Sequence, residues 1–286
     1  MHRAASVLLA LTLSGLAGAA EAPTSREFKL LLQGERFASW EDGAGAYWAL
    51  VRQVAWAQGV DVRALPWEAR ARQVVFLDTP DHALRAAGYS LRVRTDQIGR
   101  DQRLDEVSEY ALKYRALSLE GAAAGDLRTR RFPADRELEE DVSYAPAAVG
   151  HIKTVYAART LIETDWSVRP RLGAWARYFP GLLELGIPPE TAVGPVNGVV
   201  VHEVKVSPAR LDFGGGVVAK LDLTLWTDQQ DRPMIGEVSF DHALPVEPWA
   251  EQLAVDFFTA LAEESDGWLE TSATKTAFTY GAVERP

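Results

Sequence analysis

The strongest indication of the fold is the stretch Val74-Val75-Phe76-Leu77-Asp78-Thr79-Pro80-Asp81. Its β-branched and aromatic residues predict a strand, and Asp-Thr-Pro-Asp predicts the turn that ends it. Two later segments, Ser90-Leu91-Arg92-Val93-Arg94 and Ala111-Leu112-Lys113-Tyr114-Arg115, each place two cations two positions apart. Side chains of a strand alternate between its faces, so each pair of cations shares one face and the apolar residues share the other. Two such strands side by side would form a surface suited to a polyanion.

Similar alternation predicts further strands along the chain. The predicted strands are 26–36, 72–77, 90–95, 109–116, 152–164, 199–207, 217–226, 234–241 and 274–280, and an extended run is considered over 137–141. Apolar residues at helical spacing predict helices over 43–58 and 247–264. The polar range 97–105 is predicted to be an exposed loop, and Gly214-Gly215-Gly216 a hairpin turn or bulge.

One face of the predicted strands is charged, whereas the opposite face is mostly Leu, Val, Phe and Tyr. The charged face carries Glu27, Lys29, Arg92, Arg94, Lys113, Arg115, Glu137, Glu139, Lys153, Arg159, Glu203, Lys205, Asp222, Glu237, Asp241 and Lys275. We therefore expect an α+β fold: one antiparallel β-barrel or tunnel of about eight or more strands, with charge inside and helices packed outside. This single domain is expected to span residues 23–286.

Composition excludes several classes of site. The chain has 286 residues, a net charge of −10 and no cysteine, which rules out disulfides, thiolate catalysis and cysteine-ligated metal. The acidic balance argues against a general nucleic-acid binder, because such binding depends on surplus Lys and Arg. A basic site enclosed in an acidic shell remains compatible with it.

The first 22 residues predict an export signal. His2 and Arg3 precede an apolar run over 4–16, and small residues follow up to Ala22. The run is shorter than the ~20 apolar residues that a membrane-spanning helix needs. We expect a cleaved signal, a periplasmic or secreted protein and no stable membrane insertion afterwards; a retained N-terminal anchor is the alternative.

A tunnel lined by both cations and carboxylates can hold a phosphate chain together with a divalent metal. Carboxylate oxygens suit Mg²⁺ or Mn²⁺, and Arg and Lys neutralise phosphate oxygens. At this point the sequence resembles the CYTH superfamily, the triphosphate tunnel metalloenzymes. The resemblance rests on Phe76-Leu77-Asp78-Thr79-Pro80-Asp81, Ser90-Leu91-Arg92-Val93-Arg94, Leu112-Lys113-Tyr114-Arg115, the acidic run 137–140, Arg159, Gly236-Glu237 and Lys275.

The resemblance implies a small phosphoanhydride or polyphosphate as ligand, and metal-dependent hydrolysis of a triphosphate as the activity. By this resemblance the catalytic residues are Lys29, Lys113 and Arg159. The substrate-binding residues are Arg92, Arg94, Lys113, Arg115, Lys205 and Lys275. The residues expected to bind Mg²⁺ or Mn²⁺ are Glu27, Glu137, Glu139 and Glu237. The sequence does not separate inorganic triphosphate from nucleoside or thiamine triphosphate, nor does it indicate an oligomeric state.

Two departures from the family pattern bear on the metal. The N-terminal Glu-x-Glu-x-Lys motif reads Ser25-Arg26-Glu27-Phe28-Lys29, and a late Glu-x-Glu reads Glu237-Val238-Ser239. A hydroxyl is a weaker ligand for a divalent cation than a carboxylate, so both changes lower the expected affinity. Two alternatives therefore stay open: a binding protein that has lost catalysis, and a structural envelope protein whose inner charges only pair with one another.

Overall fold

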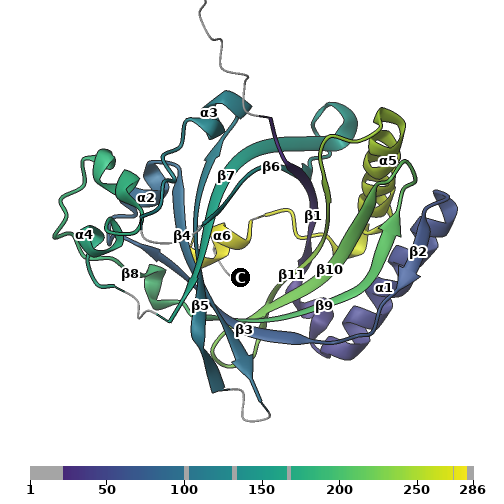
Figure 1. Cartoon of the computed structure of the whole chain (residues 1–286). Coiled ribbons are helices and arrows are strands. Elements are labelled where there is room, and N and C mark those ends of the chain that lie inside the picture. Colours follow the sequence, from purple (N-terminus) through teal and green to yellow (C-terminus); the bar gives the residue numbers. More distant parts are fainter. Residues whose placement is uncertain (1–21, 100–102, 131–133, 166–168, 273, 282–286) are drawn as a thin grey trace, which may run out of the picture.

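The computed structural model describes residues 22–99, 103–130, 134–165, 169–272 and 274–281. These residues form a β-barrel with helices packed on its outside (Figure 1), so the predicted α+β tunnel is confirmed. The predicted export signal, residues 1–22, lies outside the described residues except for Ala22. No helix in the described part of the chain is both long enough and apolar enough to cross a bilayer.

Nine strands of the described chain close the barrel. They follow the order β9, β10, β11, β1, β6, β7, β5, β4 and β3, and β3 pairs with β9 to complete the ring. Their bounds are β1 (Ser25–Gln33), β3 (Arg70–Asp78), β4 (Tyr89–Ile98), β5 (Arg103–Ala116), β6 (Asp135–Tyr144), β7 (Ile152–Thr164), β9 (Val201–Asp212), β10 (Val218–Thr227) and β11 (Pro233–Ala243). Two short strands, β2 (Asp61–Ala64) and β8 (Gly194–Pro195), pair with β9 and β3 outside the ring.

One strand pair differs from the antiparallel arrangement that the sequence predicts. Strands β1 and β6 run parallel, with Glu27 beside Asp141, whereas the other pairings among the described strands are antiparallel. A short hairpin forces neighbouring strands to be antiparallel, but β1 and β6 lie more than 100 residues apart in the chain, so no hairpin sets their relative direction. The tunnel is therefore a mixed barrel.

Helices cover the apolar outer face of the barrel on two sides. Helices α1 (Trp40–Ala57) and α5 (Pro248–Glu264), both predicted, lie against one side in Figure 1. Short helices α2 (Ala83–Ala86), α3 (Leu119–Ala123) and α4 (Leu172–Trp175) lie at the opposite side. Each side has its own buried apolar cluster between helices and strands.

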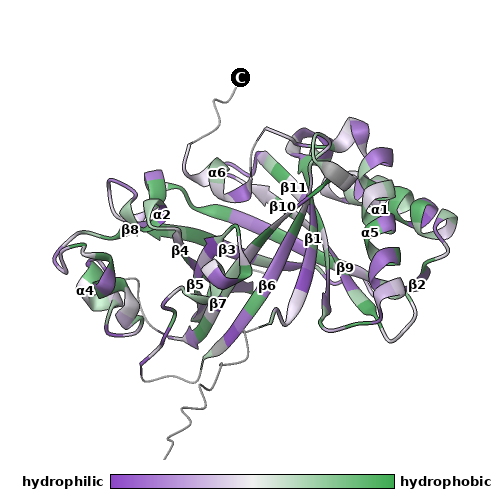
Figure 2. Cartoon of the chain, turned by 90° about the horizontal axis from the view of Figure 1, so that it is seen from above, coloured by the Kyte–Doolittle hydropathy of each residue, from purple (hydrophilic) through white to green (hydrophobic). Residues whose placement is uncertain are grey.

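Strand β1 illustrates how alternation places charge inside the barrel. Phe28 and Leu30 are at most 1% exposed and belong to the apolar cluster under α1 and α5, whereas Glu27 and Lys29 line the inner cavity. Figure 2 shows hydrophilic and hydrophobic residues alternating along the strands. The predicted arrangement of the strands, with charge inside and apolar residues outside, is therefore confirmed.

Two predicted elements are wrong. Residues 274–280, predicted as a strand, form helix α6 (Lys275–Thr279), because Thr274 caps it by accepting from Ala277 N at 3.1 Å. The predicted loop 97–105 includes the ends of two strands: β4 continues to Ile98 and β5 begins at Arg103, with these two residues paired, while residues 100–102 lie outside the described residues. Polar residues are stable there because this end of the hairpin is accessible to water.

The barrel is expected to lose substantial stability when its outer apolar layer is truncated. Leu223 of β10 is 2% exposed within the cluster under α1 and α5, so Leu223→Ala should lower the free energy of unfolding by about 2–5 kcal/mol. Leu117→Ala is the matched control, since Leu117 is 81% exposed and its truncation should change stability by less than about 0.5 kcal/mol. Urea titration measures both, and equal losses in the two variants would contradict the assigned layering.

Candidate functional site

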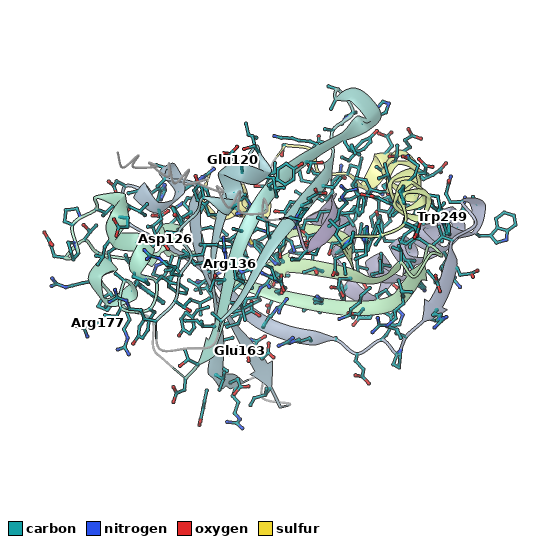
Figure 3. All side chains as sticks on the ribbon, turned by 45° about the horizontal axis from the view of Figure 1, so that its top comes forward. Glu120, Asp126, Arg136, Glu163, Arg177 and Trp249 are labelled. Carbon is teal, nitrogen blue, oxygen red and sulfur yellow. The ribbon has the colours of Figure 1, made fainter. Side chains whose placement is uncertain are left out.

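The inner side chains of the barrel surround a cavity of about 980 Å³. Figure 3 shows side chains projecting inward from the strands, whereas Trp249 points away from the outer surface. The basic lining residues are Lys29, Arg72, Arg85, Arg92, Arg94, Lys113, Arg115, Arg136, Arg159, Lys205 and Lys275. The acidic lining residues are Glu27, Glu137, Glu139, Asp141, Glu203, Asp222, Glu237 and Asp241. Every site residue predicted from the sequence therefore lines one cavity.

The paired arginines of β4 share a single carboxylate on the neighbouring strand. Glu109 of β5 lies 3.4 Å from Arg94 and 3.7 Å from Arg92, so its ion pairs are loose. The buried Nε atoms of both arginines have no hydrogen-bond partner among the described residues. Burial and the neighbouring Arg94 lower the pKa of Arg92 to about 9. The guanidinium groups of Arg92 and Arg94 therefore have more hydrogen-bond donors than nearby acceptors, and their positive charge is only partly compensated.

On the wall formed by β1, β5 and β6, lysines and carboxylates are tightly interleaved. Lys29 Nζ lies 2.6 Å from Glu27 and 2.8 Å from Asp141, and Lys113 Nζ lies 2.7 Å from Glu139 and 2.9 Å from Asp141. Burial opposes charge on Lys29, but Glu27 and Asp141 outweigh it and raise the pKa of this lysine. Burial, with Lys29 nearby, lowers the pKa of Lys113.

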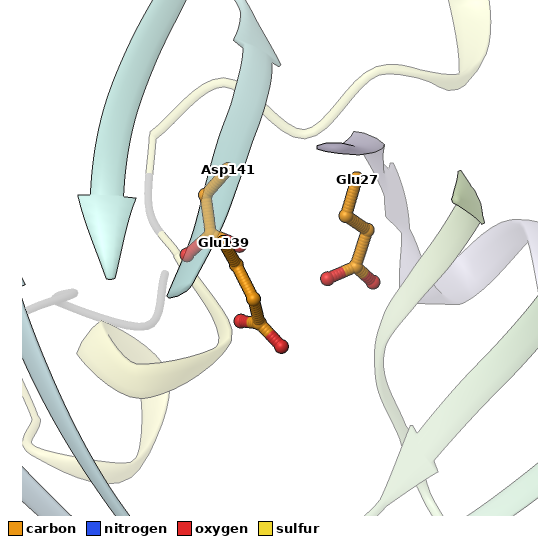
Figure 4. A group of neighbouring side chains, drawn as sticks. All are labelled: Glu27, Glu139 and Asp141. Atoms are coloured by element: carbon orange, nitrogen blue, oxygen red, sulfur yellow. The ribbon is translucent and has the colours of Figure 1, made fainter. Parts of the chain in front are cut away.

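Three carboxylates on this wall form a candidate metal site. Ligand atoms of Glu27, Glu139 and Asp141 lie within 4.8 Å of one another, and Figure 4 shows Glu27 facing the other two from β1. The three side chains supply hard oxygen donors, so the site fits Mg²⁺ or Mn²⁺. Lys29 and Lys113 now contact the same oxygens, so a metal ion there would compete with both ammonium groups.

Two of the predicted metal ligands lie outside this group. Glu137 pairs with Arg159, and Glu237 of β11 pairs with Lys275 at 2.8 Å. The register explains the position of Glu237, since the residue of β11 beside Glu27 is Asp241 rather than Glu237. The third carboxylate of the candidate metal site is Asp141 of β6. Asp141 follows Glu139 by two residues and so shares its strand face, and this spacing could have identified it from the sequence.

The wall formed by β9 and β10 carries its own ion pairs. Lys205 of β9 pairs with Asp222 of β10, and Ser207 donates to the same carboxylate at 2.5 Å. Asp241 lies nearby, and burial together with the charges of Glu27 and Asp222 raises its pKa. This wall therefore brings Lys205 into the cavity but leaves it bound to a carboxylate.

Arg72 is a site residue that was not predicted from the sequence. Arg72 is 5% exposed, lines the cavity and pairs with the fully buried Glu203. Its signal was the spacing of four residues from Phe76, which places both side chains on the inner face of β3. Glu203 was recognised as part of the charged face, but its partner was not.

The Asp-Thr-Pro turn anchors the end of β3, as the sequence predicts. The Asp78 carboxylate accepts from the backbone N–H groups of Thr79 at 2.7 Å, Leu84 at 2.9 Å and Arg85 at 3.1 Å. The hydroxyl of Tyr280 donates to the same carboxylate at 2.8 Å. Asp78 is therefore a structural residue that ties the C-terminal segment to the turn.

Comparisons with known proteins find structural neighbours only. No family model and no curated protein match the chain. A Hippeastrum protein described as an adenylyl cyclase with a dominant triphosphatase activity is 14% identical, with a TM-score of 0.46 over 92% of this chain and 98% of its own. Proteins described as adenylate cyclases from Bacillus halodurans and Vibrio parahaemolyticus are each 13% identical, with TM-scores of 0.37 and 0.36. They cover 89% and 90% of this chain, and 98% of each of their own chains.

The carboxylates of the inner wall should make stability depend on pH in the acid range. Burial opposes charge on Glu139, but Lys113 and Arg159 outweigh it and lower its pKa from 4.5 to about 2. Its contribution is thus complete above pH 4.5 and is lost as the pH falls towards 2. Urea unfolding at pH values from 6 to about 3 should show a steeper loss for the wild type than for Glu139→Gln. Parallel curves for the two proteins would exclude this assignment.

Proposed function

We propose that the tunnel binds a linear phosphoanhydride, either a triphosphate or a short polyphosphate, as a small-molecule ligand. The observation that carries this proposal is the convergence of Arg92, Arg94, Lys113 and Arg115 in one cavity of a protein with a net charge of −10. Guanidinium and ammonium groups form short charge-assisted hydrogen bonds with phosphate oxygens. The unpaired Nε atoms of Arg92 and Arg94 add donors that a phosphate chain would satisfy.

The reaction that suits this cavity is hydrolysis of a phosphoanhydride bond. Water attacks a terminal phosphorus, the bond to the bridging oxygen breaks, the leaving phosphate takes up the negative charge, and the attacking water gives up a proton to the solvent. Lys29, Lys113 and Arg159 would stabilise charge on the phosphate oxygens as it grows. A divalent cation held by Glu27, Glu139 and Asp141 would add positive charge against the same oxygens.

Binding without catalysis is the second candidate function. Ser25 and Ser239 both line the cavity, where each contributes a neutral hydroxyl rather than a carboxylate. Ser25 lies beside Glu139 in the parallel ladder, so the wall next to the candidate metal site carries one ligand fewer than it would with Glu. A weaker metal site favours a protein that retains a phosphate ligand without cleaving it.

We infer from the signal-like sequence of the first 22 residues that the protein acts outside the cytoplasm. An exported protein meets little ATP, so inorganic tripolyphosphate or another phosphoanhydride suits the location better than a nucleotide-fuelled role. Detection of the processed protein in the periplasm or medium would test the location.

Tripolyphosphate is expected to raise the melting temperature of the wild type, because a ligand that binds only the native state stabilises it. Arg92→Ala and Lys113→Ala should each weaken the affinity about tenfold or more through loss of a charge-assisted bond. Arg63→Ala is the matched control, since the Arg63 side chain is 74% exposed and pairs with Asp212 outside the cavity. Calorimetric titration measures the affinities. Unchanged binding in both cavity variants would refute the site.

A restored carboxylate should separate the two candidate functions. Ser25→Glu places a fourth carboxylate beside Glu139, which should strengthen Mg²⁺ or Mn²⁺ binding. If the wild type only binds tripolyphosphate, it releases no phosphate with metal, and Ser25→Glu gains release. Steady release by the wild type, abolished by a chelator, would instead establish hydrolysis.

A further inference from the structure

Three side chains form a row across adjacent strands of the tunnel wall. Trp226 of β10 pairs in register with Glu203 of β9, and Glu203 pairs in register with Arg72 of β3. The indole Nε1–H of Trp226 donates to Glu203 Oε2 at 2.7 Å, and the Nε–H of Arg72 donates to Glu203 Oε1. Each oxygen of the Glu203 carboxylate therefore holds one partner.

The row is buried, which fixes the orientation of Arg72. Glu203 and Trp226 are each 1% exposed, and Arg72 is 5% exposed. Glu203 contacts the Nε edge of the Arg72 guanidinium, whose terminal nitrogens have no hydrogen-bond partner within the described ranges. Because Arg72 also lines the cavity, these terminal nitrogens remain for a bound group.

Arg92 and Arg94 complete a cluster of three arginines with Arg72. Arg94 lies 4.0 Å from Glu203, and burial together with the Arg94 charge lowers the pKa of Arg72. Only Glu109 and Glu203 contact these guanidinium groups among the described carboxylates. An anionic group among the three would receive hydrogen bonds from donors that now lack acceptors.

We propose that Arg72, Arg92 and Arg94 form a subsite for one phosphate group of the ligand, and that Glu203 is its positioning residue. Glu203, held by Trp226, orients Arg72 and does not itself contact the ligand. This inference rests on the proposed function, since it specifies how the tunnel binds one phosphate group of a phosphoanhydride.

Glu109 provides an internal comparison, because it faces the same arginines in a different way. Its contacts with Arg92 and Arg94 are 3.7 and 3.4 Å, and its side chain is 21% exposed. Such a loose carboxylate mainly competes with an incoming anion for the guanidinium groups. Removing its charge should therefore strengthen anion binding, whereas removing the charge of a positioning residue should weaken it.

The test compares tripolyphosphate affinities of four variants by calorimetric titration. Glu203→Gln keeps the volume but retains one acceptor oxygen for two donors, so it should weaken binding about fivefold. Glu109→Gln should strengthen binding about threefold. Arg72→Gln should weaken binding about tenfold. Trp226→Phe removes the donor to Glu203 and part of the ring that Lys275 approaches at 4.9 Å, and should weaken binding about threefold. Circular dichroism and melting curves identify any variant that fails to fold.

The proposal is decided by the direction in which the affinity for tripolyphosphate changes: Glu203→Gln should lower it, and Glu109→Gln should raise it. A purely electrostatic role for Glu203 predicts tighter binding in Glu203→Gln, as in Glu109→Gln, and that result would overturn the positioning role. Unchanged affinity in Arg72→Gln would overturn the subsite. If Glu203→Gln does not fold, Trp226→Phe is the variant to compare with the wild type, because it alters no charge. Unchanged affinity in Trp226→Phe would then contradict the positioning role. Failure of the wild type to bind tripolyphosphate would refute the proposed function itself, which is a separate outcome.

Discussion

The barrel depends on charge compensation along its inner wall. Asp141 shows the principle, since its carboxylate lies within 2.9 Å of both Lys29 and Lys113 and its pKa falls well below the usual range despite burial. An unpaired charge removed from water costs several kcal/mol, so each inner carboxylate needs a nearby cation. Compensation is nearly complete around Asp141 and incomplete around Arg92 and Arg94. Ion pairs therefore stabilise the wall around Asp141, whereas the arginines of β4 keep enough uncompensated positive charge to attract an anion.

The sequence was enough to predict which face of a strand each side chain occupies. It was not enough to predict which residues lie beside one another on neighbouring strands. Side-chain direction follows from local alternation, so Arg92, Lys113 and Glu139 were assigned to the interior correctly. Register depends on how distant strands meet, and a shift of two residues changes which carboxylates adjoin. Asp241 rather than Glu237 therefore lies beside Glu27. Arg72 was overlooked because the predicted strand began at residue 72, which left out Arg70 and therefore hid the paired spacing of Arg70-Ala71-Arg72.

The C-terminal segment shows where local pattern fails. The range 274–280 contains three Thr and two aromatic residues, types that favour a strand, yet residues Lys275–Thr279 are helical. Its conformation is set by contacts made elsewhere: Tyr280 donates to Asp78, and the Arg85 guanidinium lies 4.4 Å from the Tyr280 ring. Both contacts join residues about 200 positions apart. Short segments of this kind follow tertiary contacts more than intrinsic preference.

The position of β1 has a consequence for the order in which the molecule assembles. Both neighbours of β1 are remote: β6 spans Asp135–Tyr144 and β11 spans Pro233–Ala243. During synthesis β1 emerges before both partners, and its second partner, β11, follows about 200 residues later. Hairpins such as β4–β5 join nearby residues and can form early. The barrel can close only after β1 has paired with the distant β11, and such non-local pairings form slowly. Until then β1 presents unpaired backbone groups, which makes it the segment most exposed to mispairing with other chains.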